Sequence, residues 1–127
     1  MLRHLTATTL IALTAGALPA AAHSLADSEW APDGETGQYI VFEDDGSVQG
    51  NAGCNRFFGK FTTTGHQISM GPFGTTRKFC GKTVMKAERN FLATLSSAKR
   101  FEFDHSLLTL FGSRGEVLLR LKPRDWD

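Results

Sequence analysis

The chain has 127 residues, with 14 Lys and Arg against 13 Asp and Glu. A net charge this close to zero argues against a nucleic-acid-binding protein, which normally carries a basic excess. The length suits one small domain, which must bury its apolar residues efficiently to be stable.

Residues 1–22 have the layout of a secretory signal peptide. Arg3 and His4 precede an apolar run over 5–18, and three alanines at 20–22 provide a small-residue cleavage site. The run is shorter than the roughly 20 apolar residues that a membrane span requires. We therefore expect cleavage after Ala22 and a periplasmic mature chain with no membrane span. Because no Cys lies near the cleavage point, we expect no lipid anchor. A retained anchor is the alternative.

Charge is unevenly distributed along the mature chain. Residues 23–45 carry seven acids and no Lys or Arg, whereas residues 46–100 carry nine bases and a single acid, Glu88. One interpretation is that the acidic segment lies across the basic middle and neutralises it. The other is a basic face that binds an anionic ligand of the cell envelope.

Short β-type runs broken by turn residues follow from Tyr39 onwards. Alternating aromatic, β-branched and polar residues predict the strands, and Gly, Asp and Ser predict the turns between them. Before the helix we expect strands over 38–43, 47–50, 55–62 and 67–70, with a structured loop over 71–74. After the helix we expect strands over 99–103, 107–111 and 116–122, the last with Val117, Leu119 and Leu121 on its buried side.

The one helical pattern runs from about Lys82 to Ser97, with Thr83 as its predicted N-cap. Apolar residues recur at helical spacing and should cover one sheet: Val84, Ala87, Phe91, Leu92 and Leu95. The opposite side, with Lys86, Arg89 and Asn90, should face solvent. Antiparallel strands with one inserted helix predict an α+β fold, whose core the ten Phe residues should supply.

The two cysteines, Cys54 and Cys80, are predicted to form a disulfide. An exported domain folds in an oxidising compartment, where an even number of cysteines in a small domain normally pairs. Zinc is the weaker alternative, because the gaps of 11, 13 and 24 residues between Cys54, His66, Cys80 and His105 match no compact zinc signature. A catalytic or redox cysteine is also disfavoured, since the chain has no C-x-x-C and no adjacent base.

Two motifs resemble those of the META domain family, which includes the HslJ-type heat-shock proteins. The run from Gly50 to Gly59 resembles the family's G-x-x-G-C-N-x-x-x-G segment, and the run from Thr75 to Cys80 resembles its second motif. The matched residues are Gly50, Gly53, Cys54, Asn55, Gly59, Thr76, Arg77 and Cys80, with Glu88 in the following helix. The likeness covers about residues 28–123 and leaves 124–127 as a C-terminal tail. It implies a small antiparallel sheet or partial barrel with one main helix packed on it.

Most of these motif residues are interpreted as structural. The glycines would permit turns or close contacts, and Asn55 could adopt a left-handed conformation or bind backbone. The alternative is a polar recognition site made of Asn55, Arg56 and Arg77, because guanidinium groups bind carboxylates and phosphates in a bidentate manner.

The function expected from these observations is binding rather than catalysis. The resemblance implies a link to heat-shock response and novobiocin resistance, but no reaction, cofactor or metal. We expect a monomeric, non-enzymatic module that supports envelope stress tolerance by binding an unidentified protein or envelope component. The alternative is a small-molecule or anionic-ligand binding module that uses the basic segment 56–100. An enzyme would need Glu88 as an acid of raised pKa, in one pocket with His66.

Overall fold

The structure is a computed structural model that describes residues 24–104 and 106–124. The predicted signal peptide at 1–22, His105 and the last three residues of the predicted tail lie outside the described residues. No helix within the described part of the chain is long and apolar enough to cross a membrane.

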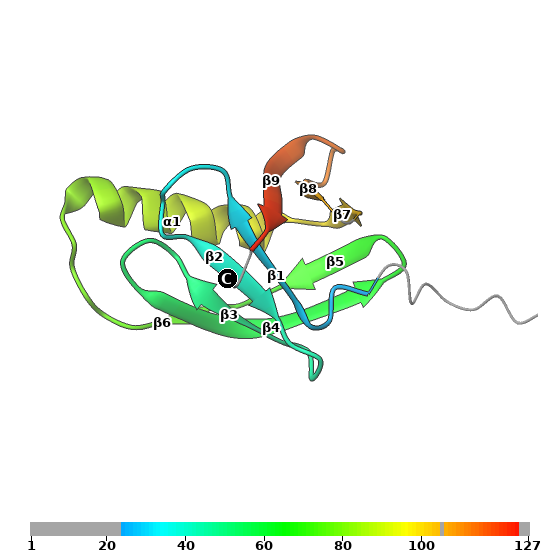
Figure 1. The fold of residues 1–127 in the computed structure, drawn as a ribbon, viewed down its shortest axis with the longest axis horizontal. Helices are drawn as coiled ribbons and strands as arrows, with labels where there is room; N and C mark the ends of the chain where they lie inside the picture. The colour runs from blue at the N-terminus through cyan, green and yellow to red at the C-terminus, as the bar shows by residue number, and fades with distance from the viewer. Residues whose placement is uncertain (1–23, 105, 125–127) are drawn as a thin grey trace, which may run out of the picture.

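The described residues form one helix and a predominantly antiparallel β-structure, so the predicted α+β class holds with the sheet as its larger part (Figure 1). The helix bounds and the β5 bounds were predicted without error, and the other predicted strands differ by one or two residues at their ends. The elements are β1 Ser28–Pro32, β2 Tyr39–Phe42, β3 Ser47–Asn51, β4 Arg56–Thr64, β5 Gln67–Met70, β6 Gly74–Thr75, α1 Lys82–Ser97, β7 Arg100–Phe103, β8 Leu108–Phe111 and β9 Val117–Pro123.

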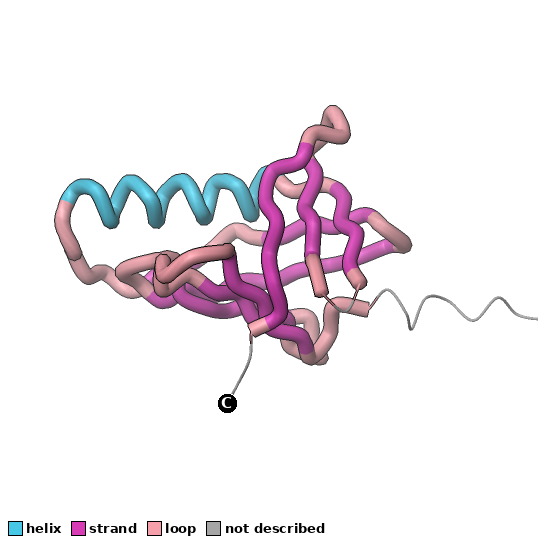
Figure 2. Tube along the Cα trace, turned by 45° about the horizontal axis from the view of Figure 1, so that its top comes forward, coloured by secondary structure: helices cyan, strands magenta, loops and turns pink. Residues whose placement is uncertain are grey.

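The strands follow one another in a ring. Their order is β3-β2-β1-β9-β8-β7-β5-β4, and β3 also pairs with β4, which closes the order on itself. Every pairing is antiparallel, as the succession of short turns predicts. The narrowest pairing joins β5 to β7 through the single register pair Gln67 and Arg100. The short strand β6 pairs with β4, and α1 lies beside the strands, in contact with β5 (Figure 2).

The core fills the inside of this ring. It holds Trp30, Ile40, Val48 and Leu108 among others, all buried. Of the ten Phe residues, four are buried: Phe42, Phe57, Phe91 and Phe101. The prediction that all ten supply the core was therefore wrong in part, because Phe58 and Phe79 point into solvent. Alternation along β4 places Phe57 inside and Phe58 outside.

Fewer side chains of the helix are buried than its apolar pattern predicts. Its buried side chains are Glu88, Phe91 and Leu95, while Val84 and Ala87, both predicted inside, are exposed. The predicted N-cap was also wrong: Thr83 lies within the helix, and Gly81 occupies the N-cap position with φ 97° and no side-chain hydrogen bond. Gly tolerates this backbone conformation, which Thr does not.

Among the described residues, the acidic N-terminal segment forms no salt bridge with the basic middle, although the charge of Lys60, after the hydrogen bonds from Ser47, helps to lower the pKa of Asp45. Within the described residues, the only ion pair that involves 23–45 joins Asp33 to Lys122 of β9, with 3.1 Å between oxygen and nitrogen. This follows from topology, because β1 lies between β2 and β9 rather than beside β4. In the last strand only Leu121 is fully buried, and Val117 is exposed, so the predicted alternation holds at one end of β9.

Candidate functional site

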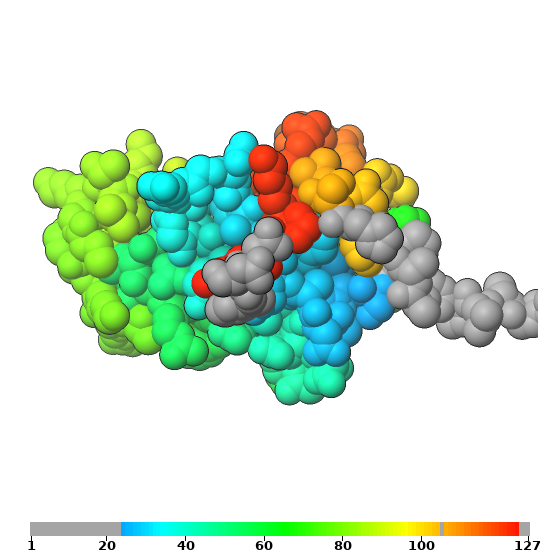
Figure 3. Space-filling view, in the orientation of Figure 1, coloured from blue at the N-terminus to red at the C-terminus, as the bar shows by residue number. Residues whose placement is uncertain are grey.

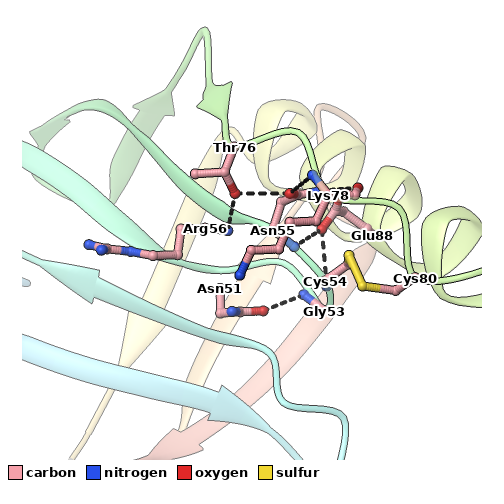
Figure 4. The surroundings of a disulfide bond; sticks show 9 residues. All are labelled: Asn51, Gly53, Cys54, Asn55, Arg56, Thr76, Lys78, Cys80 and Glu88. Atoms are coloured by element: carbon pink, nitrogen blue, oxygen red, sulfur yellow. Dashed lines mark hydrogen bonds between the residues drawn. A yellow bond between two sulfur atoms is a disulfide. The ribbon is translucent and has the colours of Figure 1, made fainter.

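The most polar buried place in the fold is the loop between β3 and β4, which meets the first half of α1 (Figure 4). Glu88 of α1 is 4% exposed, and its carboxylate faces this loop. Oε1 accepts hydrogen bonds from the backbone N–H groups of Cys54 at 3.1 Å and Asn55 at 2.5 Å, and Oε2 accepts one from Nδ2 of Asn55 at 2.8 Å. A buried carboxylate is stable only with such partners.

These three donors determine the protonation state of Glu88. Burial by itself raises the pKa of the carboxyl, and the bonds from the Asn55 side chain, the Asn55 N–H and the Cys54 N–H more than offset it, so that the pKa lies below its ordinary value. Glu88 is therefore ionised at neutral pH. An acid of raised pKa at this position, as the enzyme alternative requires, is contradicted.

Asn55 extends the network from Glu88 to the segment after β6. Its Oδ1 accepts from Oγ1 of Thr76 at 2.9 Å and from the backbone N–H of Lys78 at 2.6 Å, and its Nδ2 also donates to the Lys78 carbonyl at 3.0 Å. Thr76 Oγ1 accepts in turn from the Arg56 N–H at 3.2 Å. The described non-Gly residues have positive φ only at Asp27, so Asn55 binds backbone without adopting a left-handed conformation.

The predicted disulfide between Cys54 and Cys80 is confirmed, and it joins the same two segments covalently. Cys54 is buried beside Glu88, whereas Cys80 is exposed just before α1. Because both sulfurs are oxidised, they supply no thiolate for the zinc alternative. Within the described residues, no group of three or more His, Cys, Asp and Glu side chains could hold a metal ion.

Two motif glycines stand where another backbone or ring approaches closely. A Cβ at Gly50 would lie 2.0 Å from the carbonyl oxygen of Tyr39 on the neighbouring strand. At Gly59 it would lie 2.9 Å from the Phe73 ring. Gly53 has φ 130°, and its N–H donates to Oδ1 of Asn51 at 2.8 Å. These positions need glycine for steric reasons, which agrees with the structural interpretation of the motif.

The three residues of the predicted recognition site do not form one surface group. Asn55 is 2% exposed, and all of its hydrogen-bonding positions are occupied within the fold. Arg56 and Arg77 are exposed, Arg56 at the start of β4 and Arg77 beyond the end of β6. The buried network is thus a brace, and only the two arginines remain available to a ligand.

A second region, which the sequence did not indicate, lies at the junction of β1, β7 and β9. Glu29, Trp30, Phe103 and Arg124 help to line a surface hollow of about 440 Å³. Burial raises the pKa of Glu29, the charge of Arg124 lowers it in part, and Glu43 raises it further. The Arg124 guanidinium lies 3.6 Å from the centre of the Tyr39 ring. In the sequence, Glu29 is one of seven acids in 23–45, and nothing distinguishes it from the other six. Its place in this hollow follows from the pairing of β1 with β9.

Comparisons with known proteins give a family from one family model and a similar fold from solved structures. The META domain model matches residues 22–125. No curated protein sequence matches the chain. A protein from Burkholderia xenovorans, solved by NMR, has a similar fold, with a TM-score of 0.67 and 19% identity over 80% of this chain and 85% of that one. A DUF4847 family protein from Bacteroides vulgatus gives a TM-score of 0.58 and 17% identity over 72% of this chain and 62% of that one. Since the family model spans nearly all of the described residues, the chain belongs to the META domain family.

Proposed function

We propose that this META domain protein is a non-enzymatic binding module of the periplasm. It supports tolerance of heat and envelope stress by binding another protein or an envelope component, and it acts as a monomer. Its family motifs build a scaffold, and its exposed residues make the contacts.

The single observation that carries the proposal is the network around Glu88. A charged group kept for chemistry would keep a free acceptor or lie in a hollow open to a substrate. The Glu88 carboxylate instead accepts three hydrogen bonds from Cys54 and Asn55. None of the three surface hollows described for this structure is lined by Glu88 or His66. The motif therefore supports the shape of the molecule rather than a reaction.

Two features support an exported location. The disulfide between Cys54 and Cys80 suits an oxidising compartment. The apolar segment before residue 22 has the composition of a signal peptide. Fractionation of the producing cells, with the N-terminus of the purified protein sequenced, tests both. We expect His23 as the first residue of periplasmic material, and the full-length chain in the cytoplasm would contradict this location.

A deletion strain tests the role in stress tolerance. We expect reduced survival under heat, detergent and novobiocin, restored by the wild-type chain. A Cys54→Ser variant should restore survival poorly, because it lacks the brace. A deletion strain that grows like its parent under all three stresses would remove the proposed role.

One observation favours the second candidate, an anionic-ligand binding module. Of the nine bases in residues 46–100, only Arg100 forms an ion pair among the described residues, with Glu102 at 3.8 Å. Titration calorimetry against lipopolysaccharide and anionic glycans, at low and high salt, tests this candidate. Binding that weakens with salt supports it, and no heat of binding at either salt concentration removes it.

A further inference from the structure

Five exposed residues on two neighbouring segments, the start of β4 and the stretch after β6, form what we call the aromatic–basic surface: Arg56, Phe58, Arg77, Lys78 and Phe79. Arg56 and Phe58 lie on the outward side of β4, one on each side of the buried Phe57. The other three follow β6, which pairs with β4 at this point.

Backbone contacts hold the two parts of this surface side by side. The N–H of Thr76 donates to the Arg56 carbonyl at 3.0 Å, and the Arg56 N–H donates to Oγ1 of Thr76 at 3.2 Å. The Phe58 ring covers Gly74 so closely that a Cβ there would lie 2.4 Å from it. The space-filling view shows the start of α1, which follows Cys80, at the end of the molecule away from the β8–β9 hairpin (Figure 3).

Phe79 is the most exposed large hydrophobic residue among those that the structure describes, at 74%, and the backbone on both sides of it is held in place. Cys80 on one side is tied to Cys54 by the disulfide. Lys78 on the other side has both its backbone N–H and its carbonyl bonded to the Asn55 side chain. A phenyl ring kept in water by a rigid backbone cannot fold back onto the protein. It loses no backbone freedom when a partner covers it, which favours binding.

The charge of this surface is not balanced locally. The single acid in residues 46–100, Glu88, directs its charge inwards to the N–H groups of Cys54 and Asn55. Arg56, Arg77 and Lys78 have no ion-pair partner among the described residues. The surface therefore combines uncompensated positive charge with two exposed aromatic rings, of which one stands beside Lys78.

We propose that the aromatic–basic surface docks on a bilayer of anionic phospholipid, with Phe79 entering the headgroup layer and Arg56, Arg77 and Lys78 on the phosphates. This inference rests on the proposed binding role and names the envelope component. Basic side chains beside an exposed apolar ring suit an anionic lipid surface. A peptide partner would need a hollow for its own side chains, and the three described hollows are lined by none of these five residues.

Flotation with lipid vesicles tests the proposal. All strands and the helix of the described residues lie within 28–123, so the chain from His23 onwards contains all of them and lacks the apolar leader. It is mixed with vesicles of phosphatidylcholine alone, or with roughly one third phosphatidylglycerol. We expect binding to the anionic vesicles only, and its loss in high salt, where screening shortens electrostatic interactions to about 3 Å.

Variants identify the surface. We expect Phe79→Ala to weaken binding about tenfold, and the double change Arg77→Ala with Lys78→Ala to weaken it about 25-fold. The matched controls are Val117→Ala and Arg114→Ala, both exposed and near the β8–β9 hairpin, which should stay within about twofold of wild type. All variants should unfold at wild-type denaturant concentrations, since every changed side chain is exposed.

Three results would overturn the proposal: equal binding to neutral vesicles, no binding to anionic ones, or the same loss in the controls as in the surface variants. Phe79→Ala binding like wild type would also overturn it, because charge alone would then explain the affinity. The deletion strain separates these failures from failure of the proposed function. A stress-sensitive deletion that is rescued by the Phe79→Ala chain leaves the binding role standing and rejects the lipid surface.

Discussion

Replacing Glu88 by Gln removes the charge of the buried carboxylate and keeps nearly the same side-chain shape, so the contribution of the charge to stability can be measured. The wild-type carboxylate accepts three hydrogen bonds, from the backbone N–H groups of Cys54 and Asn55 and from Nδ2 of Asn55. A Gln at this position has one oxygen. If that oxygen keeps the two backbone donors, the NH₂ group of the Gln side chain faces Nδ2 of Asn55. Both groups are donors, so no hydrogen bond forms between them.

The magnitude follows from these contacts. A hydrogen bond to a charged group contributes about 1.5–3 kcal/mol, and a buried donor left without its partner costs about 1–3 kcal/mol. One charge-assisted bond is lost and two become neutral, so we expect Glu88→Gln to lower the free energy of unfolding by about 3 kcal/mol. For a small domain this is a large share of the total stability.

Denaturant unfolding followed by circular dichroism at neutral pH measures the effect. The control is Glu102→Gln, an exposed carboxylate of β7 whose ion pair with Arg100 is solvent-accessible. That change should cost less than about 0.5 kcal/mol. A Glu88→Gln chain as stable as the control would refute the argument that the carboxylate is the centre of the brace.

The difference in unfolding free energy between the wild-type and Glu88→Gln chains should also depend on pH. The folded-state pKa of Glu88 lies below the ordinary value of 4.5, so its stabilising contribution is fully present above that value. It is lost as the pH falls through the folded-state pKa, because protonation removes the charge that the three donors require. Gln does not titrate, and the difference in stability between the two chains should therefore shrink on acidification. A difference that grows as the pH falls would contradict the assignment.

Three further changes test other parts of the fold. Gly50→Ala should lower the free energy of unfolding by about 3 kcal/mol or more, because the new methyl group would lie 2.0 Å from a backbone oxygen; thermal melting measures it, and an unchanged melting temperature would speak against the close approach. Replacing Cys54 and Cys80 by Ser should cost about 3.5 kcal/mol, as expected for a closed loop with a sequence separation of 26, and denaturant unfolding at equal midpoints would count against this. Phe57→Ala should cost about 3–5 kcal/mol, whereas Phe58→Ala should cost below about 1 kcal/mol, because only the first ring is buried; equal losses would contradict the alternation along β4.

Local patterns predicted the helix and seven strands, because these patterns depend on neighbouring residues, but they predicted neither β1 nor β6. The helix Lys82–Ser97 and the strand Gln67–Met70 were both predicted with the bounds that the structure has. The disulfide also followed from reasoning that needs no coordinates, since two cysteines have one possible pairing within the chain. What these patterns do not contain is the order of strands around the ring.

Glu88 shows why the site was harder to predict. Treating only apolar residues as the inner side of the helix placed Val84 and Ala87 inside. The first half of α1 instead faces the N–H groups of a loop, where a carboxylate is the better partner. A signal was available, because Glu88 lies three and seven residues before Phe91 and Leu95 and so falls on the buried stripe.

The charge pattern was also interpreted from the sequence without knowledge of which elements become neighbours. An acidic segment next to a basic one in sequence suggests mutual neutralisation, but sequence proximity says nothing about which strands become neighbours. Asp33 pairs with Lys122, 89 residues away. Because the acidic segment forms its ion pair elsewhere, the basic residues of the aromatic–basic surface have no ion-pair partner among the described residues. The sequence did not indicate Phe79, because a single apolar residue in a loop belongs to no periodic pattern.

The pairing of β1 with β9 determines when the ring of strands can close during synthesis. Trp30 in the first strand lies opposite Pro123 in the last, so the opening segment cannot gain its second neighbour until almost the entire chain has been synthesised. Contacts between residues so far apart in sequence are slow to form, because the entropy of closing a long loop must be overcome first. Until residues 121–123 emerge, the edge of β1 that will face β9 has no strand to pair with.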